Sequence, residues 1–194
     1  MHLTGGQFKG RYIATPTGYE NPVKPTLSKV RESVFNILNS YFMQKGLNGD
    51  VFCELSFLDM FTGSGIMALE AYSRGFKKVV AIEKQSSVFA AVKKIYREFS
   101  ADISLLRGDS TKLAGKFCTT ENEKFDVIYI DPPWDFDYLP IVEAALNCLS
   151  KDGVIITECN KKGANRRYRF NGTEILPFRE KIYGRCKLDF IKLP

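Results

Sequence analysis

The sequence predicts an α/β fold with a mostly parallel sheet, and three observations favour it. From Ser56 onward, short apolar runs alternate with segments of helical periodicity. The turns after successive strands carry glycines or acids, at the positions where open parallel sheets bind ligands. Residues 165–193 instead alternate charged and apolar residues around a Tyr183-Gly184 break, which predicts two or more antiparallel strands closing the sheet edge.

The predicted elements follow in a regular order. Strands are predicted at Ser56–Met60, Lys78–Ile82, Ile103–Leu106, Val127–Ile130 and Gly153–Glu158. Helices are predicted at Leu27–Gln44, Ile66–Arg74, Ser86–Ser100 and Tyr138–Leu149. Thr26 and Ser28 offer N-caps to the first helix, and Ser110 offers one to a further short helix. Helices between parallel strands cover both faces of a sheet, so we expect binding at the carboxyl ends of the strands.

The first 25 residues differ from the rest in composition. They contain several glycines and prolines among basic residues, and we expect a short hairpin arm around Gln7–Ile13 followed by a linker. Residues 26–194 are then a single domain of ordinary size. The basic residues Lys9, Arg11 and Lys24, interleaved with aromatic ones, favour a binding arm over a floppy terminus.

Composition limits the classes of function. The 194 residues carry a formal charge of +6 with a pI of about 9.0, which permits a polyanionic partner. No apolar run approaches the ~18 residues of a membrane span, and the N-terminus lacks a signal pattern. Five widely spaced cysteines predict reduced thiols in a cytoplasmic protein, without a disulfide frame or a metal site. His2 is the only histidine and is terminal, which argues against histidine-based catalysis.

A glycine-rich loop and three strand-end acids suggest a nucleoside-containing cofactor. Gly63–Ala68 fits the pattern G-x-G-x-x-[GA], in which glycines let the backbone approach an anionic group. Glu83, about 20 residues further, suits the hydroxyls of a ribose. Asp109 suits an adenine amino group, and Asp59 could pair with an ammonium or orient the loop. Each acid taken alone could equally well be a solvated strand end. Their succession at three strand ends favours a binding site for NAD or S-adenosylmethionine.

The strand within Phe125–Trp134 ends at an unusual corner. Two prolines stop the ladder, because they lack a backbone N–H, directly after the acid Asp131. The corner exposes the Asp131 carboxylate, the Pro132 carbonyl and the indole of Trp134, the only tryptophan. Acceptors beside an aromatic plane suit a nucleobase with an amino group, although Trp134 could also be a core aromatic. This corner favours S-adenosylmethionine over NAD.

On these motifs the chain resembles class I amino-methylating methyltransferases. Asp59–Gly65 is similar to their cofactor loop, and Asp131–Trp134 to their (Asp/Asn/Ser)-Pro-Pro-aromatic motif. More narrowly, the whole chain resembles the bacterial 16S ribosomal RNA guanine-N2 methyltransferases. The further matching segments are Gly6–Arg11, Lys24-Pro25-Thr26, Lys29–Asn36 and Tyr183-Gly184. Lys24 replaces the family's usual Arg, and Leu27-Ser28 its usual Thr-Asp.

The resemblance implies a Rossmann-like class I methyltransferase fold with a mostly parallel seven-stranded sheet and antiparallel C-terminal strands. It implies methyl transfer from S-adenosylmethionine to the exocyclic N2 of a guanine in 16S ribosomal RNA, by a monomer acting on RNA or the small ribosomal subunit. The expected catalytic residues are Asp131, Pro132 and Trp134. The expected cofactor-binding residues are Asp59, Phe61, Gly63, Ser64, Gly65, Glu83, Asp109, Ser110, Thr26 and Arg31. The expected RNA-binding residues are Lys9, Arg11, Lys24, Lys161, Lys162, Arg166 and Arg167.

Three other functions stay open at this point. A DNA adenine-N6 methyltransferase would share the corner but normally needs an added target-recognition segment, for which this chain has no room. An NAD-dependent oxidoreductase would share the loop but needs a catalytic His, a Tyr-x-x-x-Lys or a substrate domain. A non-catalytic RNA-binding protein could retain the cofactor fold as a relic.

Overall fold

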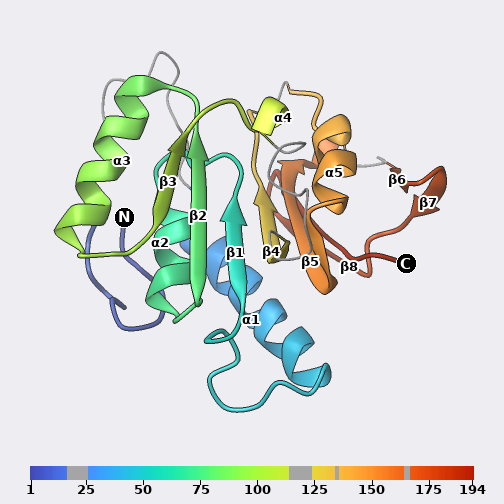
Figure 1. Ribbon diagram of the computed structural model, residues 1–194, viewed down its shortest axis with the longest axis horizontal. Coiled ribbons are helices and arrows are strands. Elements are labelled where there is room, and N and C mark those ends of the chain that lie inside the picture. The colour runs from blue at the N-terminus through green and yellow to red at the C-terminus, as the bar shows by residue number, and fades with distance from the viewer. Residues whose placement is uncertain (17–25, 114–123, 134–135, 164–166) are drawn as a thin grey trace. The chain divides into compact units, whose positions relative to one another are not determined.

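The computed structural model describes residues 1–16, 26–113, 124–133, 136–163 and 167–194. The fold has the predicted class, a mostly parallel α/β sheet of seven strands with antiparallel strands at the C-terminus. Figure 1 shows the alternation of helices and strands along the chain. Two compact units make up the chain, Met1–Asp109 and Ser110–Pro194. Three residues with predicted roles, Lys24, Trp134 and Arg166, lie outside the described ranges.

The sheet of the first unit consists of three parallel strands. They are β1 (Ser56–Asp59), β2 (Lys78–Glu83) and β3 (Ser104–Arg107), with β2 in the middle. Helix α2 (Ile66–Ser73) connects β1 to β2, and α3 (Ser86–Glu98) connects β2 to β3. Because parallel strands are covered on both faces, they form near-continuous apolar runs, and β2 is buried from its second residue onward.

Helix α1 (Ser28–Gln44) lies where its apolar periodicity predicted it. Its buried side includes Phe35, whose ring contacts those of Phe52, Phe57 and Phe76. The predicted caps are wrong: Leu27 is the N-cap, and no side chain caps the helix. The Ser28 hydroxyl accepts a hydrogen bond from Arg31 instead, because that buried guanidinium needs acceptors.

The predicted N-terminal hairpin is present and begins earlier, at Met1. Backbone hydrogen bonds join Leu3 to Arg11 (3.0 Å) and Met1 to Ile13 (2.7 Å). The hairpin is anchored to the end of α2, since the Gln7 N–H donates to the Ser73 carbonyl at 2.7 Å. The Leu3 and Ile13 side chains are each 2% exposed, so the arm shares the core of the first unit.

A buried ion network fixes the hairpin to both helices. The fully buried Glu70 on α2 pairs with Arg31 on α1 at 3.1 Å, and with Arg74 one helical turn along. Its Oε1 also accepts hydrogen bonds from the N–H and hydroxyl of Thr4, at 2.7 and 2.9 Å. Arg31 completes the link by donating to the carbonyl of His2 at 2.6 Å.

The second unit begins with the short helix α4 (Ser110–Leu113) and contains β4, α5 and β5 in βαβ order. Strand β4 (Phe125–Ile130) is parallel to β5 (Leu149–Asn160), and α5 (Leu139–Leu146) connects them. The predicted boundary between helix and strand was too late by several residues. Leu149 pairs with Phe125 and is buried, so β5 begins there instead of at Gly153.

Antiparallel strands complete the second unit, as the tail pattern predicted. Strand β9 (Cys186–Ile191) pairs with β5, and β8 (Arg179–Tyr183) pairs with β9. The turn between β8 and β9 contains Gly184, whose φ of 60° is in the left-handed region that favours glycine. A separate hairpin of β6 (Tyr168–Phe170) and β7 (Thr173–Ile175) packs against α5.

The cysteine prediction requires a correction. Cys53, Cys159 and Cys186 are free, but Cys148 is disulfide-bonded. A disulfide needs Cα atoms about 4.4–6.8 Å apart, and spacing along the sequence does not reveal that distance.

Among the described helices, none is long and apolar enough to cross a membrane.

Candidate cofactor loop and catalytic corner

Two acidic side chains end the neighbouring strands β1 and β2 of the first unit. Asp59 is 1% exposed and Glu83 is 9% exposed. Burial raises the pKa of Asp59 to about 7; a hydrogen bond from the Phe61 N–H opposes this, and the nearby Glu83 charge adds to it. Burial also raises the pKa of Glu83. The two carboxyl groups therefore form a poorly solvated acidic pair at the carboxyl ends of parallel strands.

The glycine loop is hydrogen-bonded to the second of these acids. The N–H of Gly63 donates to Oε2 of Glu83 at 3.1 Å, while the N–H of Gln85 donates to Oε1 at 2.8 Å. The N–H of Thr62 donates to the carbonyl of Ile82 at 3.1 Å. The structure thus brings together the loop and the acid that the sequence spacing associates with a ribose.

The loop needs its glycines for backbone geometry. Gly63 and Gly65 have φ values of 49° and 78°, in the left-handed region. A Cβ on Gly65 would lie 2.9 Å from Cγ1 of Val92 on α3, so a side chain there would have to displace Val92. Gly65 is also the N-cap of α2, so the free N–H groups of the helix begin directly after it. Ser64 is buried and Phe61 is half-buried.

Tyr96 on α3 contacts this loop, a role that we did not predict from the sequence. Its hydroxyl donates a hydrogen bond to the carbonyl of Gly65 at 3.2 Å. Burial, with the charges of Asp59 and Glu83, raises the pKa of Tyr96 well above its usual value, so the hydroxyl stays a donor. Helical periodicity places Tyr96 on the buried side of α3, but a hydroxyl aimed at a carbonyl leaves no sequence signal.

The remaining strand-end residues occupy two further positions. Asp109 follows β3 and forms an ion pair with Lys84 at 2.9 Å, with about a quarter of its side chain exposed. Ser110 is buried and begins α4 of the second unit. Their contacts with a cofactor stay predictions.

Thr26 and Arg31, which we expected to bind the cofactor, belong to the buried ion network around Glu70. The Arg31 side chain is 2% exposed, and its guanidinium donates to the carbonyls of Thr26 and His2 while pairing with Glu70. The network accounts for the presence of a cation near the start of α1, where the helix dipole does not favour one. Expected cofactor contacts for this pair also stay predictions.

The predicted catalytic corner follows β4 in the second unit. Strand β4 is almost wholly buried, and Asp131 comes directly after it with its side chain half-buried. Pro132 is buried and Pro133 is exposed. The carbonyl of Pro133 accepts a hydrogen bond from the N–H of Phe136 at 2.8 Å. The corner thus holds a carboxylate at the end of a buried strand, directly before two prolines.

A second acid lies near this corner and escaped the sequence reasoning. Glu158 near the end of β5 accepts a hydrogen bond from the Tyr129 hydroxyl at 2.6 Å, and both are buried. Burial raises the pKa of the Cys186 thiol, and so do the carboxylates of Glu158 and Asp131. Asp131 and Glu158 therefore both lie close enough to Cys186 to act on the same thiol.

The described residues of the predicted RNA-binding set are all exposed; they are Lys9, Arg11, Lys161, Lys162 and Arg167. Arg11 lies over the ring of Phe99 at 3.9 Å, which fixes its position on the hairpin. Arg167 forms an ion pair with Glu174 at 2.9 Å. The set is therefore distributed over the N-terminal hairpin and the region after β5.

The family model described as Conserved hypothetical protein 95 matches residues 1–192. The chain belongs to this family. A curated relative from Buchnera aphidicola, named Ribosomal RNA small subunit methyltransferase D, is 28% identical over 173 residues, 84% of this chain and 79% of that protein. The protein of the same name from Escherichia coli K12 is 26% identical over 163 residues, 81% and 71% of the two chains. These relatives confirm the resemblance read from the N-terminal motifs.

Solved structures support the same fold. A protein from Escherichia coli superimposes with a TM-score of 0.78 at 24% identity, covering 98% of this chain and 96% of that chain. A SAM-dependent methyltransferase from Agrobacterium tumefaciens superimposes with a TM-score of 0.51 at 15% identity, covering 66% and 44%. With the family, the prediction of a methyltransferase that uses S-adenosylmethionine is confirmed.

The raised pKa of Asp59 predicts a specific pH dependence of stability. The folded state binds this proton more tightly than the unfolded state, so Asp59 lowers the free energy of unfolding as pH rises from about 4 to about 7. Asp59→Asn should remove that contribution, at most roughly 4 kcal/mol at about 1.4 kcal/mol per pKa unit. Urea unfolding at pH 5 and pH 7.5 measures it; equal pH slopes in both proteins would contradict the assignment.

Loss of the Tyr96 hydroxyl should weaken cofactor binding. Tyr96→Phe keeps the ring against Gly65 but removes one hydrogen bond of about 0.5–1.5 kcal/mol, so the Kd for S-adenosylmethionine should rise about 2- to 10-fold. Calorimetric titration measures the Kd, with Tyr72→Phe on α2 as the matched control. If Tyr96→Phe lowers the urea midpoint without changing the Kd, the hydroxyl serves the fold alone.

Proposed function

We propose that the protein transfers the methyl group of S-adenosylmethionine to the exocyclic N2 amino group of a guanine in 16S ribosomal RNA. The observation that carries this proposal is the Asp131-Pro132-Pro133 corner, an acceptor-bearing turn after a buried strand, in a chain of this family. The relatives named for small-subunit ribosomal RNA favour RNA over DNA as the substrate.

In this proposal the first unit binds the cofactor. Glu83 accepts hydrogen bonds from the ribose hydroxyls, because it ends β2 and lies against the glycine loop. Asp59 orients the loop through the N–H of Phe61, and Asp109 accepts from the adenine amino group. Phe61 and Ser64 contribute the neighbouring surface in this unit.

The corner activates the target nitrogen by orienting it. The lone pair of an exocyclic amino group is conjugated into the base, which makes the nitrogen a poor nucleophile. Hydrogen bonds from its N–H groups to the Asp131 carboxylate and the Pro132 carbonyl favour a pyramidal nitrogen with its lone pair aimed at the sulfonium methyl. Positioning supplies most of the rate, and the carboxylate stabilises the developing positive charge. Trp134 stacks on the base, a contact of about 1–3 kcal/mol.

Asp131 acts as an acceptor and not as the base that starts the reaction. The amino group is hardly acidic before transfer, so a carboxylate is too weak a base to deprotonate it. After the new N–C bond forms, the cationic nitrogen loses a proton easily. The methyl group leaves the sulfur with no electron pair, and the neutral thioether S-adenosylhomocysteine is the second product.

The RNA is held by exposed cations, including Lys9 and Arg11 on the hairpin. A paired guanine must leave its stack before the corner can reach its amino group, so the target is a flipped or unpaired nucleotide. We expect the enzyme to act as a monomer in the cytoplasm, on ribosomal RNA or the small ribosomal subunit.

Substitutions of Asp131 test the proposed chemistry. Asp131→Asn retains one acceptor oxygen and should keep measurable activity, whereas Asp131→Ala removes both and should leave very little, with similar cofactor affinity in each. Single-turnover transfer to 16S ribosomal RNA at saturating cofactor, with mass spectrometry for N2-methylguanosine, measures both rate and product. Asp102→Asn, at an exposed position, is the control for loss of charge. Complete loss in both variants would indicate an obligatory carboxylate, and a different methylated nucleoside would reject the guanine-N2 assignment.

Removing charge from the hairpin should weaken RNA binding. Lys9→Gln with Arg11→Gln should lower the affinity for 16S ribosomal RNA and reduce the slope of log K against log salt by about 1.4–1.8, the effect of two lost phosphate contacts. Filter binding at several salt concentrations measures it, with Lys94→Gln, an exposed lysine of α3, as the control. An unchanged slope in the double variant would assign the hairpin a purely structural role.

A further inference from the structure

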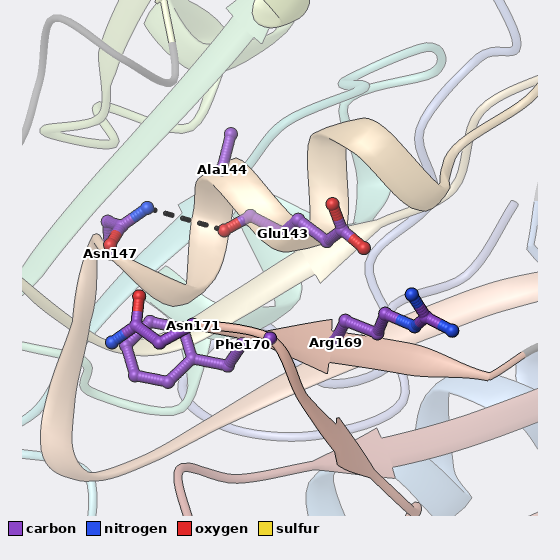
Figure 2. Close-up of a pocket in the computed structure, with 7 residues that line it drawn as sticks. Glu143, Ala144, Asn147, Arg169, Phe170 and Asn171 are labelled. Atoms are coloured by element: carbon purple, nitrogen blue, oxygen red, sulfur yellow. Dashed lines mark hydrogen bonds between the residues drawn. The ribbon is translucent and has the colours of Figure 1, made fainter.

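A polar pocket in the second unit is separate from the corner residues and has no role in the reaction above. Its volume is about 490 Å³, within the range of small-ligand sites, and it lies between α5 and the β6–β7 hairpin. Figure 2 shows the Phe170 ring with the amides of Asn147 and Asn171 at one end, and the charged groups of Glu143 and Arg169 at the other.

The hairpin wall of this pocket is firmly held. Phe170 and Thr173 are paired across the turn, and the two residues between them, Asn171 and Gly172, have φ values of 50° and 79°. Left-handed values at both positions match the tight turn of a two-residue β-hairpin. Beneath the turn, Tyr168 is fully buried and donates a hydrogen bond to Asp189 at 2.7 Å.

Arg169 provides an available cation at this pocket. It is exposed and lies opposite Glu174 in the strand register, but that carboxylate pairs with Arg167 at 2.9 Å. Within the described parts of the chain, no ion pair involves Arg169. Its planar guanidinium suits a phosphate oxygen pair.

We infer that this pocket binds one unpaired nucleotide of the RNA substrate, outside the nucleotide that is methylated. Arg169 contacts the phosphate, and the half-exposed Phe170 ring stacks on the base. The amides of Asn147 and Asn171 bond the base edge or the 2′-hydroxyl, and Glu143 accepts from an amino group of the base. The inference rests on the proposed function, since it takes RNA as the substrate.

The composition of the pocket favours a nucleotide over a simple anion. A carboxylate inside the pocket repels a free inorganic anion but pairs with the donors of a base. An aromatic face beside amides is the combination that single-stranded RNA sites use. The exposed Lys161 and Lys162, between β5 and β6 in the same unit, add positive charge for a backbone.

Two substitutions separate the expected contacts. Arg169→Ala should lower affinity for 16S ribosomal RNA about 5- to 10-fold and reduce the salt slope by about 0.7–0.9, the loss of one phosphate contact. Phe170→Leu should lower affinity by about 5-fold or more with an unchanged salt slope, because stacking releases no counterions. Arg179→Ala, an exposed arginine on β8, is the matched control and should bind like the unsubstituted protein.

Filter binding over a salt series gives both quantities, and the Kd for S-adenosylmethionine and the urea midpoint should not change. The pocket does not bind RNA if both variants fold and bind RNA as tightly as the unsubstituted protein. If the unsubstituted protein also methylates the RNA in that case, the proposed function stands. If the unsubstituted protein neither binds nor methylates 16S ribosomal RNA, the proposed function fails, and the pocket inference fails with it.

Discussion

The buried carboxylate of Glu70 is the interaction on which the first unit depends. An ionised group without exposure is tolerated only when its charge is paired and its oxygens accept hydrogen bonds. Arg31, Arg74 and Thr4 meet that requirement from α1, from the C-terminal end of α2 and from the N-terminal hairpin. Loss of one partner would leave an uncompensated charge, so these three segments must assemble together. Arg31 and Glu70 thus determine how α1, α2 and the hairpin pack together, and they contribute little to the formation of each helix.

A similar constraint operates at the glycine loop. Its left-handed residues leave space for α3 to approach within contact distance of Gly65, and Glu83 binds the Gly63 N–H. The loop is therefore held from two sides by groups on β2 and α3. A loop arranged before the cofactor arrives loses less conformational entropy on binding than a mobile one.

Sequence reasoning succeeded for the fold, where the signal is local: the alternation of strands and helices is the predicted one. The glycine loop and Glu83 also lie together as expected, because parallel strands deliver their carboxyl ends to one edge, while their contacts with a cofactor stay predictions. Sequence reasoning failed where partners are distant in sequence. Nothing near Arg31 in the chain indicates Glu70, and nothing near Gly65 indicates the hydroxyl of Tyr96. The start of β5 was missed because pairing with Phe125, not local propensity, decides it.

The hairpin anchored on Ser73 has a consequence for how binding energy is used. Disordered basic tails must lose backbone freedom when they engage a nucleic acid, and that loss offsets part of each contact. Here the backbone of residues 1–13 is already ordered against α2, and Arg11 is already fixed over Phe99. The hairpin lost its conformational entropy during folding, where the core contacts of Leu3 and Ile13 compensated for that loss. When this hairpin binds an anion, nearly the full free energy of each charge contact therefore contributes to affinity.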